Sequence, residues 1–168
     1  IPEGWTVIND GEDIDYHSKY LIIEALEDGL TAKLSINTCE YRIDDGTWAT
    51  LSANTNTPSI NTGQTLSFRG NLTPASSKGI GTFTISKKCN VKGNIMSMLY
   101  GDDKNDLTGK DYAFKNLFSG CTNVVEAHNL ILPATTLAIY CYQNMFYGCS
   151  SLTTAPELLA TTLANYCY

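Results

Sequence analysis

A repeat near the C-terminal end constrains the fold of this chain more than any other feature. Residues 112–121 are echoed by residues 140–149, and an asparagine, a phenylalanine, a glycine and a cysteine recur at intervals of 28 positions. The sequence Ala-Thr-Thr-Leu-Ala at 134–138 returns at 160–164. Repeats of about 20 to 50 residues are typical of solenoids, whose units each bury an apolar face against a neighbour. The pattern therefore predicts stacked coils that present a surface, rather than an enzyme.

Composition and charge limit the classes of function. The chain has 168 residues, of which 43% are hydrophobic and 17% charged, and this balance is sufficient for one domain or two small ones. The net charge of −6 and the lack of a long basic cluster argue against nucleic-acid partners. No run approaches the roughly 18 consecutive apolar residues of a membrane-spanning helix, so no membrane insertion is expected. The chain begins at Ile1 without a methionine, so any export signal is expected to precede that residue.

The segment 18–100 has the texture of a β-sandwich. Short runs rich in Ile, Leu, Thr, Tyr and Phe are separated by Gly, Asn, Asp and Pro. Asp44, Asp45 and Gly46 predict a hairpin turn. Several short antiparallel strands over about 80 residues favour a small sandwich. The strands are expected near residues 20–26, 31–37, 39–44, 47–52, 65–70, 80–86 and 88–95.

The chain divides into four parts on this reading. They are an acidic arm or linker at 1–17, the sandwich at 18–100, a junction loop at 101–111, and the repeats at 112–168, of which about two are complete and a third is truncated. In each repeat, an extended run such as 123–127 or 151–155 is expected to supply one parallel strand. The carboxylates of the loop 101–106 do not follow the EF-hand spacing, so a solvated turn is favoured there over a calcium site.

Six cysteines raise the question of disulfides. The four in the repeats occupy matching places in successive units, which favours buried free thiols. Cys39 and Cys89 lie in two separate predicted strands, and the sequence leaves open whether they are bridged. No C-x-x-C spacing is present, so neither a metal nor another cofactor is expected.

Two groups of residues are candidates for ligand contact, and none is a candidate for catalysis. In the first group, side chains of the predicted repeat strands are expected to face outward on a concave surface, beside inward-pointing residues such as Val124 and Ala155. In the second, Tyr41 and Trp48 flank the predicted hairpin and are a possible platform for stacking sugar rings, although one face of that hairpin is expected to be core. The outward-facing residues of the first group are Glu126, His128, Thr154 and Pro156.

The repeat sequence resembles a known family. Residues 144–156, Asn-Met-Phe-Tyr-Gly-Cys-Ser-Ser-Leu-Thr-Thr-Ala-Pro, followed by the Ala-Thr-Thr-Leu-Ala run at 160–164, resemble the BspA-like, or Treponema-type, leucine-rich repeats of bacterial surface proteins. Residues 41–48, 68–70 and 93–97 resemble the β-sandwich that often precedes such repeats in gut Bacteroidales proteins. The resemblance implies a β-rich fold, with an antiparallel, immunoglobulin-like sandwich followed by the start of a leucine-rich repeat solenoid of the α/β kind.

The resemblance also implies a function. The protein is expected to be exported, on the cell surface or attached to the outer membrane, and to bind a host or microbial protein or glycan without catalysis. An alternative is a carbohydrate-binding accessory module of a glycan-capture system, and another is a purely structural cap or spacer. Self-association through an open C-terminal repeat end is a further expectation, because an uncapped coil exposes apolar area and a free strand edge.

Overall fold

A computed structural model describes residues 19–101 and 104–168. This part of the chain is β-rich and contains a single turn of helix. All seven strands expected within 18–100 are present at shorter lengths, whereas the arm expected at 1–17 lies outside the described residues. The elements are β1 (Leu21–Ala25), β2 (Ala32–Leu34), β3 (Cys39–Ile43), β4 (Ala49–Leu51), β5 (Thr65–Arg69), β6 (Phe83–Ile85), β7 (Cys89–Asn94), α1 (Ser97–Tyr100), β8 (Val124–Glu126) and β9 (Leu130–Ile131).

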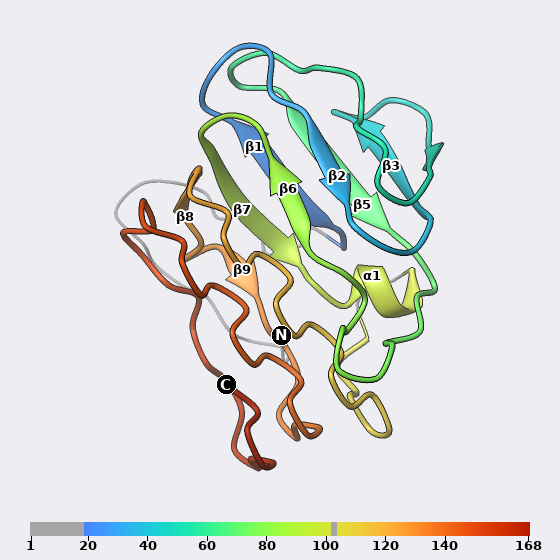
Figure 1. Cartoon of the computed structure of the whole chain (residues 1–168), viewed down its shortest axis with the longest axis vertical. Coiled ribbons are helices and arrows are strands. Elements are labelled where there is room, and N and C mark those ends of the chain that lie inside the picture. Colours follow the sequence, from blue (N-terminus) through green and yellow to red (C-terminus); the bar gives the residue numbers. More distant parts are fainter. Residues whose placement is uncertain (1–18, 102–103) are drawn as a thin grey trace, which may run out of the picture.

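The strands form a large sheet and a small one (Figure 1). The large sheet has the order β4-β3-β5-β1-β7-β8, with β9 also paired to β7, and the small sheet is β2-β6. Every pair among β1 to β7 is antiparallel. The predicted hairpin is confirmed, because β3 and β4 pair and the Gly46 amide donates a hydrogen bond of 2.9 Å to the Ile43 carbonyl.

The core lies between the two sheets. Strand β1 alternates buried and half-buried residues, so that Leu21, Ile23 and Ala25 face inward. Phe68 of the large sheet meets Phe83 of the small sheet edge to face, with ring centroids 5.1 Å apart. This packing of two sheets fits the predicted β-sandwich.

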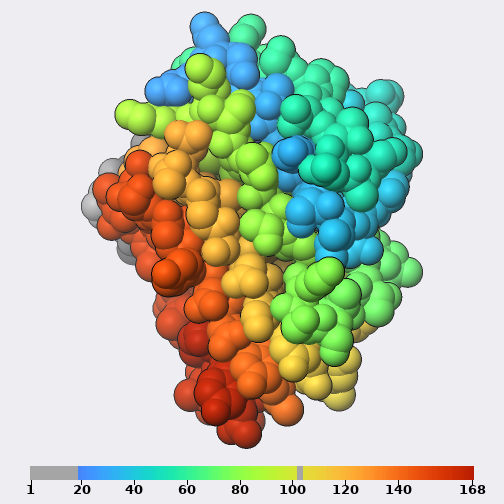
Figure 2. Space-filling model, in the orientation of Figure 1, coloured from blue at the N-terminus to red at the C-terminus, as the bar shows by residue number. Residues whose placement is uncertain are grey.

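Strand β7 joins the sandwich to the repeats. It pairs antiparallel with β1 on one side and parallel with β8 and β9 of the first repeat on the other. The amides of Ile80 and Phe83 donate hydrogen bonds to the carbonyls of Ala113 and Leu117, so a second part of the sandwich also contacts the first repeat. In Figure 2 the yellow and orange atoms of the first repeat lie directly against the green atoms around β6. Buried residues of both segments therefore form one continuous core.

Backbone hydrogen bonds connect one repeat to the next. Five alternate amides, from Tyr112 to Gly120, donate to carbonyls 27 positions later, at distances of 2.7 to 3.0 Å. The ladder continues where the amides of Tyr140 and Tyr142 donate to the carbonyls of Asn165 and Cys167. The amides between these donors, such as those of Lys115 and Leu117, donate within their own turn, so every second backbone donor depends on the neighbouring level.

Side chains repeat the same vertical contacts. The rings of Phe83, Phe118 and Phe146 stack at centroid separations of 5.6 and 5.4 Å. The thiols of Cys121 and Cys149 each donate to the backbone carbonyl of the phenylalanine one level earlier, Phe83 or Phe118, at 3.1 Å. The repeated cysteine is thus both a small buried residue and a hydrogen-bond donor between levels.

The cysteines are buried and free, and the Cys39–Cys89 question has a geometric answer. Cys39 lies on β3 and Cys89 on β7, with β5 and β1 between them. Three strand spacings amount to about 14 Å, whereas the α-carbons of a disulfide lie within about 7 Å. Burial also raises the pKa of Cys39, Cys89, Cys121 and Cys141 to about 12, which disfavours the reactive thiolate at neutral pH.

The second predicted repeat strand, at 151–155, does not form. Only an isolated parallel bridge between Glu126 and Thr154 forms there. The alternation of inward and outward side chains requires a continuous strand, and beyond Thr154 it is lost. Ala155 is therefore exposed and Pro156 is buried, the reverse of the expectation.

We predict that Phe118→Ala lowers the free energy of unfolding by about 3–5 kcal/mol, because Phe118 is fully buried between two stacked rings. Urea unfolding followed by circular dichroism measures the change. The control is Tyr147→Ala, whose side chain is 72% exposed, and which should change stability by about 0.5 kcal/mol or less. Equal effects of the two substitutions would contradict the stacked core.

Candidate functional site

The large sheet presents one polar face away from the core. Strand pairing places Glu40 beside Arg69, and Asn90 beside Glu126. Side chains of paired residues project to the same side of a sheet, so this face continues from the sandwich to the first repeat. We call it the outer face. It includes Glu40 and Arg42 of β3, Arg69 of β5, Glu24 of β1, Asn90 and Lys92 of β7, and Glu126 of β8.

An aromatic–cation cluster occupies one end of the outer face. The Arg69 guanidinium lies 4.2 Å from the centroid of the Trp48 ring, and that of Arg42 lies 5.1 Å from it. The Trp48 ring also meets the Tyr20 ring edge-on at 4.9 Å. Arg69 Nε donates a 2.7 Å hydrogen bond to Glu40 Oε2. Arg69 is thus held by an aromatic ring and a carboxylate at once.

The predicted platform of Tyr41 and Trp48 does not form. Neighbouring residues on a strand point to opposite sides, so Tyr41 faces away from Arg42 and packs against the core. Trp48 lies on the other side, among the arginines. The expectation that one face of the hairpin packs against the core is confirmed. Tyr41 lies on that face and Trp48 on the opposite one, so the two rings do not share a surface.

The ion pair changes the titration of both partners. The hydrogen bond from Arg69 lowers the pKa of Glu40 below its ordinary value. The same bond to Glu40 raises the pKa of Arg69. The side chains are 31% exposed for Arg69 and 45% exposed for Glu40, so solvent screens the attraction and the pair orients side chains more than it stabilises the fold.

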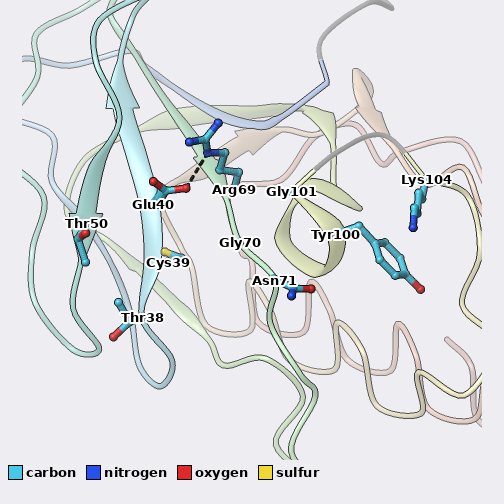
Figure 3. A pocket seen from close by; sticks show the side chains of 10 residues that line it. All are labelled: Thr38, Cys39, Glu40, Thr50, Arg69, Gly70, Asn71, Tyr100, Gly101 and Lys104. Atoms are coloured by element: carbon cyan, nitrogen blue, oxygen red, sulfur yellow. Dashed lines mark hydrogen bonds and ion pairs between the residues drawn. The ribbon is translucent and has the colours of Figure 1, made fainter.

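A hollow of about 700 Å³ opens beside this ion pair (Figure 3). Thr38 and Thr50 lie on one side of it, with the Glu40–Arg69 pair at its edge, and Asn71 and Lys104 come from the other side. No local pattern predicts this hollow, because it joins residues from β3, β4, the end of β5 and the segment after α1.

The first repeat forms a second cluster of polar side chains on the sheet. His128 Nδ1 lies 3.5 Å from Glu126 Oε2 and 3.4 Å from Thr154 Oγ1. The bridge between Glu126 and Thr154 brings residues of two successive repeats together. Three of the four predicted outward-facing residues are therefore neighbours at the surface. Pro156 does not join them, because it is buried.

The carboxylate of the hairpin turn takes part in the fold. Asp44 accepts a 2.8 Å hydrogen bond from the amide of Thr65 at the start of β5, which lowers the pKa of its carboxyl. In the described ranges 19–101 and 104–168, no group of three or more His, Cys, Asp or Glu side chains is arranged to hold a metal ion. Part of the acidic loop 101–106, residues 102 and 103, lies outside the described residues.

Comparison with known proteins identifies no relative: no protein-family model, no curated protein and no solved structure matches this chain. In the described part of the chain, no helix has the length and hydrophobicity needed to cross a bilayer.

We predict that Arg69→Gln raises the pKa of Glu40 toward 4.5, its ordinary value, because the variant removes the hydrogen bond that favours the carboxylate. Because the pKa of Glu40 is lower in the folded than in the unfolded protein, its carboxylate stabilises the fold at pH values above the unfolded-state pKa. This contribution is lost as the pH falls through the lower, folded-state pKa. The stability difference between the wild type and the variant should therefore be larger at pH 7 than at pH 3. Carbon-detected NMR titration gives the pKa, and urea unfolding at both pH values gives the stability.

The matched control is Lys87→Gln, at an exposed lysine between β6 and β7. It removes one positive charge without touching the cluster, and it should leave the Glu40 titration unchanged. A Glu40 pKa that is the same in the wild type and Arg69→Gln would show that the ion pair does not exist in solution.

Proposed function

We propose that this protein is a non-catalytic recognition protein of a bacterial cell surface, which binds a host or microbial protein or glycan through a BspA-like leucine-rich repeat array. In this proposal an immunoglobulin-like sandwich precedes the first coils of the solenoid, and the protein is exported. The proposal rests on the repeated sequence at 112–168 and on its resemblance to that family.

The regular contacts between levels support a solenoid. Five alternate amides of the first repeat each donate a hydrogen bond to the carbonyl 27 positions later, so donor and acceptor keep a constant separation. Parallel bridges link Glu126 to Thr154 and Thr136 to Thr162, so each level contributes extended residues in the same direction. This is the arrangement in which stacked units build a continuous recognition surface.

The cluster of Glu126, His128 and Thr154 is the observation that carries the recognition function. The imidazole of His128 lies within 3.5 Å of both a carboxylate and a hydroxyl, which come from two successive repeats. Together they offer hydrogen-bond acceptors and donors to a polar ligand. A catalytic reading has less support, because the thiols of the described chain are buried and burial raises the pKa of Cys121 to about 12.

The exposed apolar side chains within residues 147–168 support a partner on this part of the repeats. Tyr147, Leu158, Leu163 and Tyr166 are each more than half exposed, which is unusual for large apolar residues of one region. Self-association through this part of the repeats remains in the proposal.

We predict that the triple variant Glu126→Gln, His128→Ala, Thr154→Ala weakens binding to the ligand of the repeat face at least tenfold, because it removes the carboxylate, the imidazole and the hydroxyl of the cluster. An array of glycans and extracellular-matrix proteins identifies the ligand, and biolayer interferometry compares dissociation constants. Lys87→Gln is the control and should bind like the wild type. A triple variant that folds and binds with full affinity would refute recognition by this cluster.

A structural cap is the second candidate function, and a specific set of contacts favours it. Strand β7 supplies the first parallel partner for β8, and Phe83 supplies the first ring for Phe118. The sandwich thus supplies the contacts that a preceding repeat would supply, through β7 on one side of the stack and through Phe83 on the other. Solenoids require such an end unit to cover their first apolar surface.

If the sandwich is a cap, Phe83→Ala should speed hydrogen exchange at the amides of Asn116, Phe118 and Gly120 by at least tenfold, because it removes the ring on which the first level stacks. The amides that pair β3 with β5 should be affected less. Hydrogen-exchange mass spectrometry with peptide resolution separates the two regions. A uniform increase over both regions would indicate global destabilisation, and would remove the support for a cap.

A further inference from the structure

The hollow beside Glu40 exists because two paired strands separate there. Strands β3 and β5 are paired up to Glu40 and Arg69. Beyond this pair, the amide of Gly70 donates to the Ser97 carbonyl, and that of Leu72 donates to the Met98 carbonyl. The chain after β5 therefore turns to α1 instead of continuing along β3. The result is a fork between Thr38 on one branch and Asn71 on the other, with the hollow between them.

The fork is held open by tight packing at Gly70. A β-carbon on this residue would lie 3.0 Å from the Leu72 side chain and 3.2 Å from the Met98 carbonyl oxygen. The Leu21 amide donates to the Ser97 hydroxyl, and this hydroxyl donates to the Phe68 carbonyl, so buried hydrogen bonds fix α1 to β1 and β5. The wall of the hollow that β5 and α1 form is thus fixed to the sheet.

The polar groups around the hollow are of two kinds. The Glu40–Arg69 pair is oriented in advance by its 2.7 Å hydrogen bond and by the contact of Arg69 with Trp48. The side chains of Thr38, Thr50 and Asn71 are exposed, and no partner for them is found among residues 19–101 and 104–168. The hollow therefore offers a carboxylate, an amide and two hydroxyls to a ligand.

We propose that this hollow binds an uncharged saccharide, by hydrogen bonds to the ligand's hydroxyl groups. Adjacent sugar hydroxyls are donors and acceptors at once, and they match planar carboxylate, amide and guanidinium groups. A volume of about 700 Å³ is within the range of small-molecule sites and suits two or three sugar rings. This site goes beyond the recognition surface of the repeats, and it does not depend on it.

The charges around the hollow are compensated at the Glu40–Arg69 pair, and Lys104 adds one positive charge at the far side. The positive charge of Arg69 is compensated by Glu40, whose carboxylate repels an anion at the centre of the site. Lys104 lies at the far side and within 5.0 Å of the Tyr100 ring. Tyr100 donates its hydroxyl to the Asp106 carbonyl, and a second lysine, Lys110, lies 5.2 Å from its ring. These lysines contact the ring, so recognition relies on hydrogen bonds more than on stacking.

The test uses the full chain labelled with ¹⁵N. Maltotriose, cellotriose, xylotriose, mannotriose and galactotriose are titrated separately, with trigalacturonic acid as the charged counterpart. We expect at least one neutral trisaccharide to shift the amide signals of Gly70, Asn71 and Gly101 in a saturable manner. Asn71→Ala and Glu40→Gln should each weaken that binding at least fivefold.

Each variant has a matched control outside the hollow. Asn61→Ala removes another exposed asparagine, and Glu24→Gln alters an ion pair on the same sheet face, with Lys92 at 3.1 Å. Both controls should bind like the wild type. Spectra of the free variants report whether they are folded, and Thr50→Ala, which leaves the ion pair intact, replaces Glu40→Gln if that variant unfolds.

Four results would overturn the proposal. They are the absence of saturable shifts with every neutral trisaccharide, tighter binding of trigalacturonic acid, equal binding by the variants and their controls, and shifts confined to Glu126, His128 and Thr154. The last result would support recognition by the repeats. Failure of this site and failure of the proposed repeat function are therefore distinguishable.

Discussion

The contact between β7 and the first repeat is the constraint on which the rest of the structure depends. Segments as short as β8 and β9 hold few backbone bonds of their own, and parallel pairing with β7 satisfies their amides and carbonyls. On the opposite side of the stack, Phe83 fixes the height and orientation of Phe118. Every later level is built on these two contacts, because the backbone amides of each level donate hydrogen bonds to carbonyls of the level that follows.

The recurrence of tyrosine in the repeats follows from left-handed turns that lie one above another in successive levels. Tyr112, Tyr140 and Tyr166 all have positive φ angles, between 54° and 62°, which a bulky residue adopts at a cost. Their rings stack at 4.9 and 5.0 Å, with interplanar angles below 10°, and this stacking offsets part of the cost. The intervals between these tyrosines are 28 and 26 residues, so the stacking fixes the position of each turn rather than one unit length. The recurrence visible in the sequence therefore has a physical cause.

Sequence patterns located the strands well, because alternation of polar and apolar residues is a local property. They failed where a side chain's environment is decided by a distant segment. Pro156 was expected at the surface, but strand pairing ends at Thr154 and the alternation does not extend to it. The hollow had no local signal, since it depends on Gly70 bonding to Ser97 instead of to β3. The stacking of repeats was foreseeable from their period, whereas their attachment through β7 was not.

Both candidate sites lie on the same face of the large sheet because of its register, the pairing of residues between neighbouring strands. Glu40 and Glu126 are four strand spacings apart, or about 19 Å, across β3, β5, β1, β7 and β8. A slip of one residue between any two of these strands would turn one site toward the core, because side chains alternate with a period of two. The buried residues of β1 and β7 oppose such a slip, since it would expose Ile23 and Val91 to water. The apolar core therefore fixes the relative position of two polar surfaces that share no residue with it.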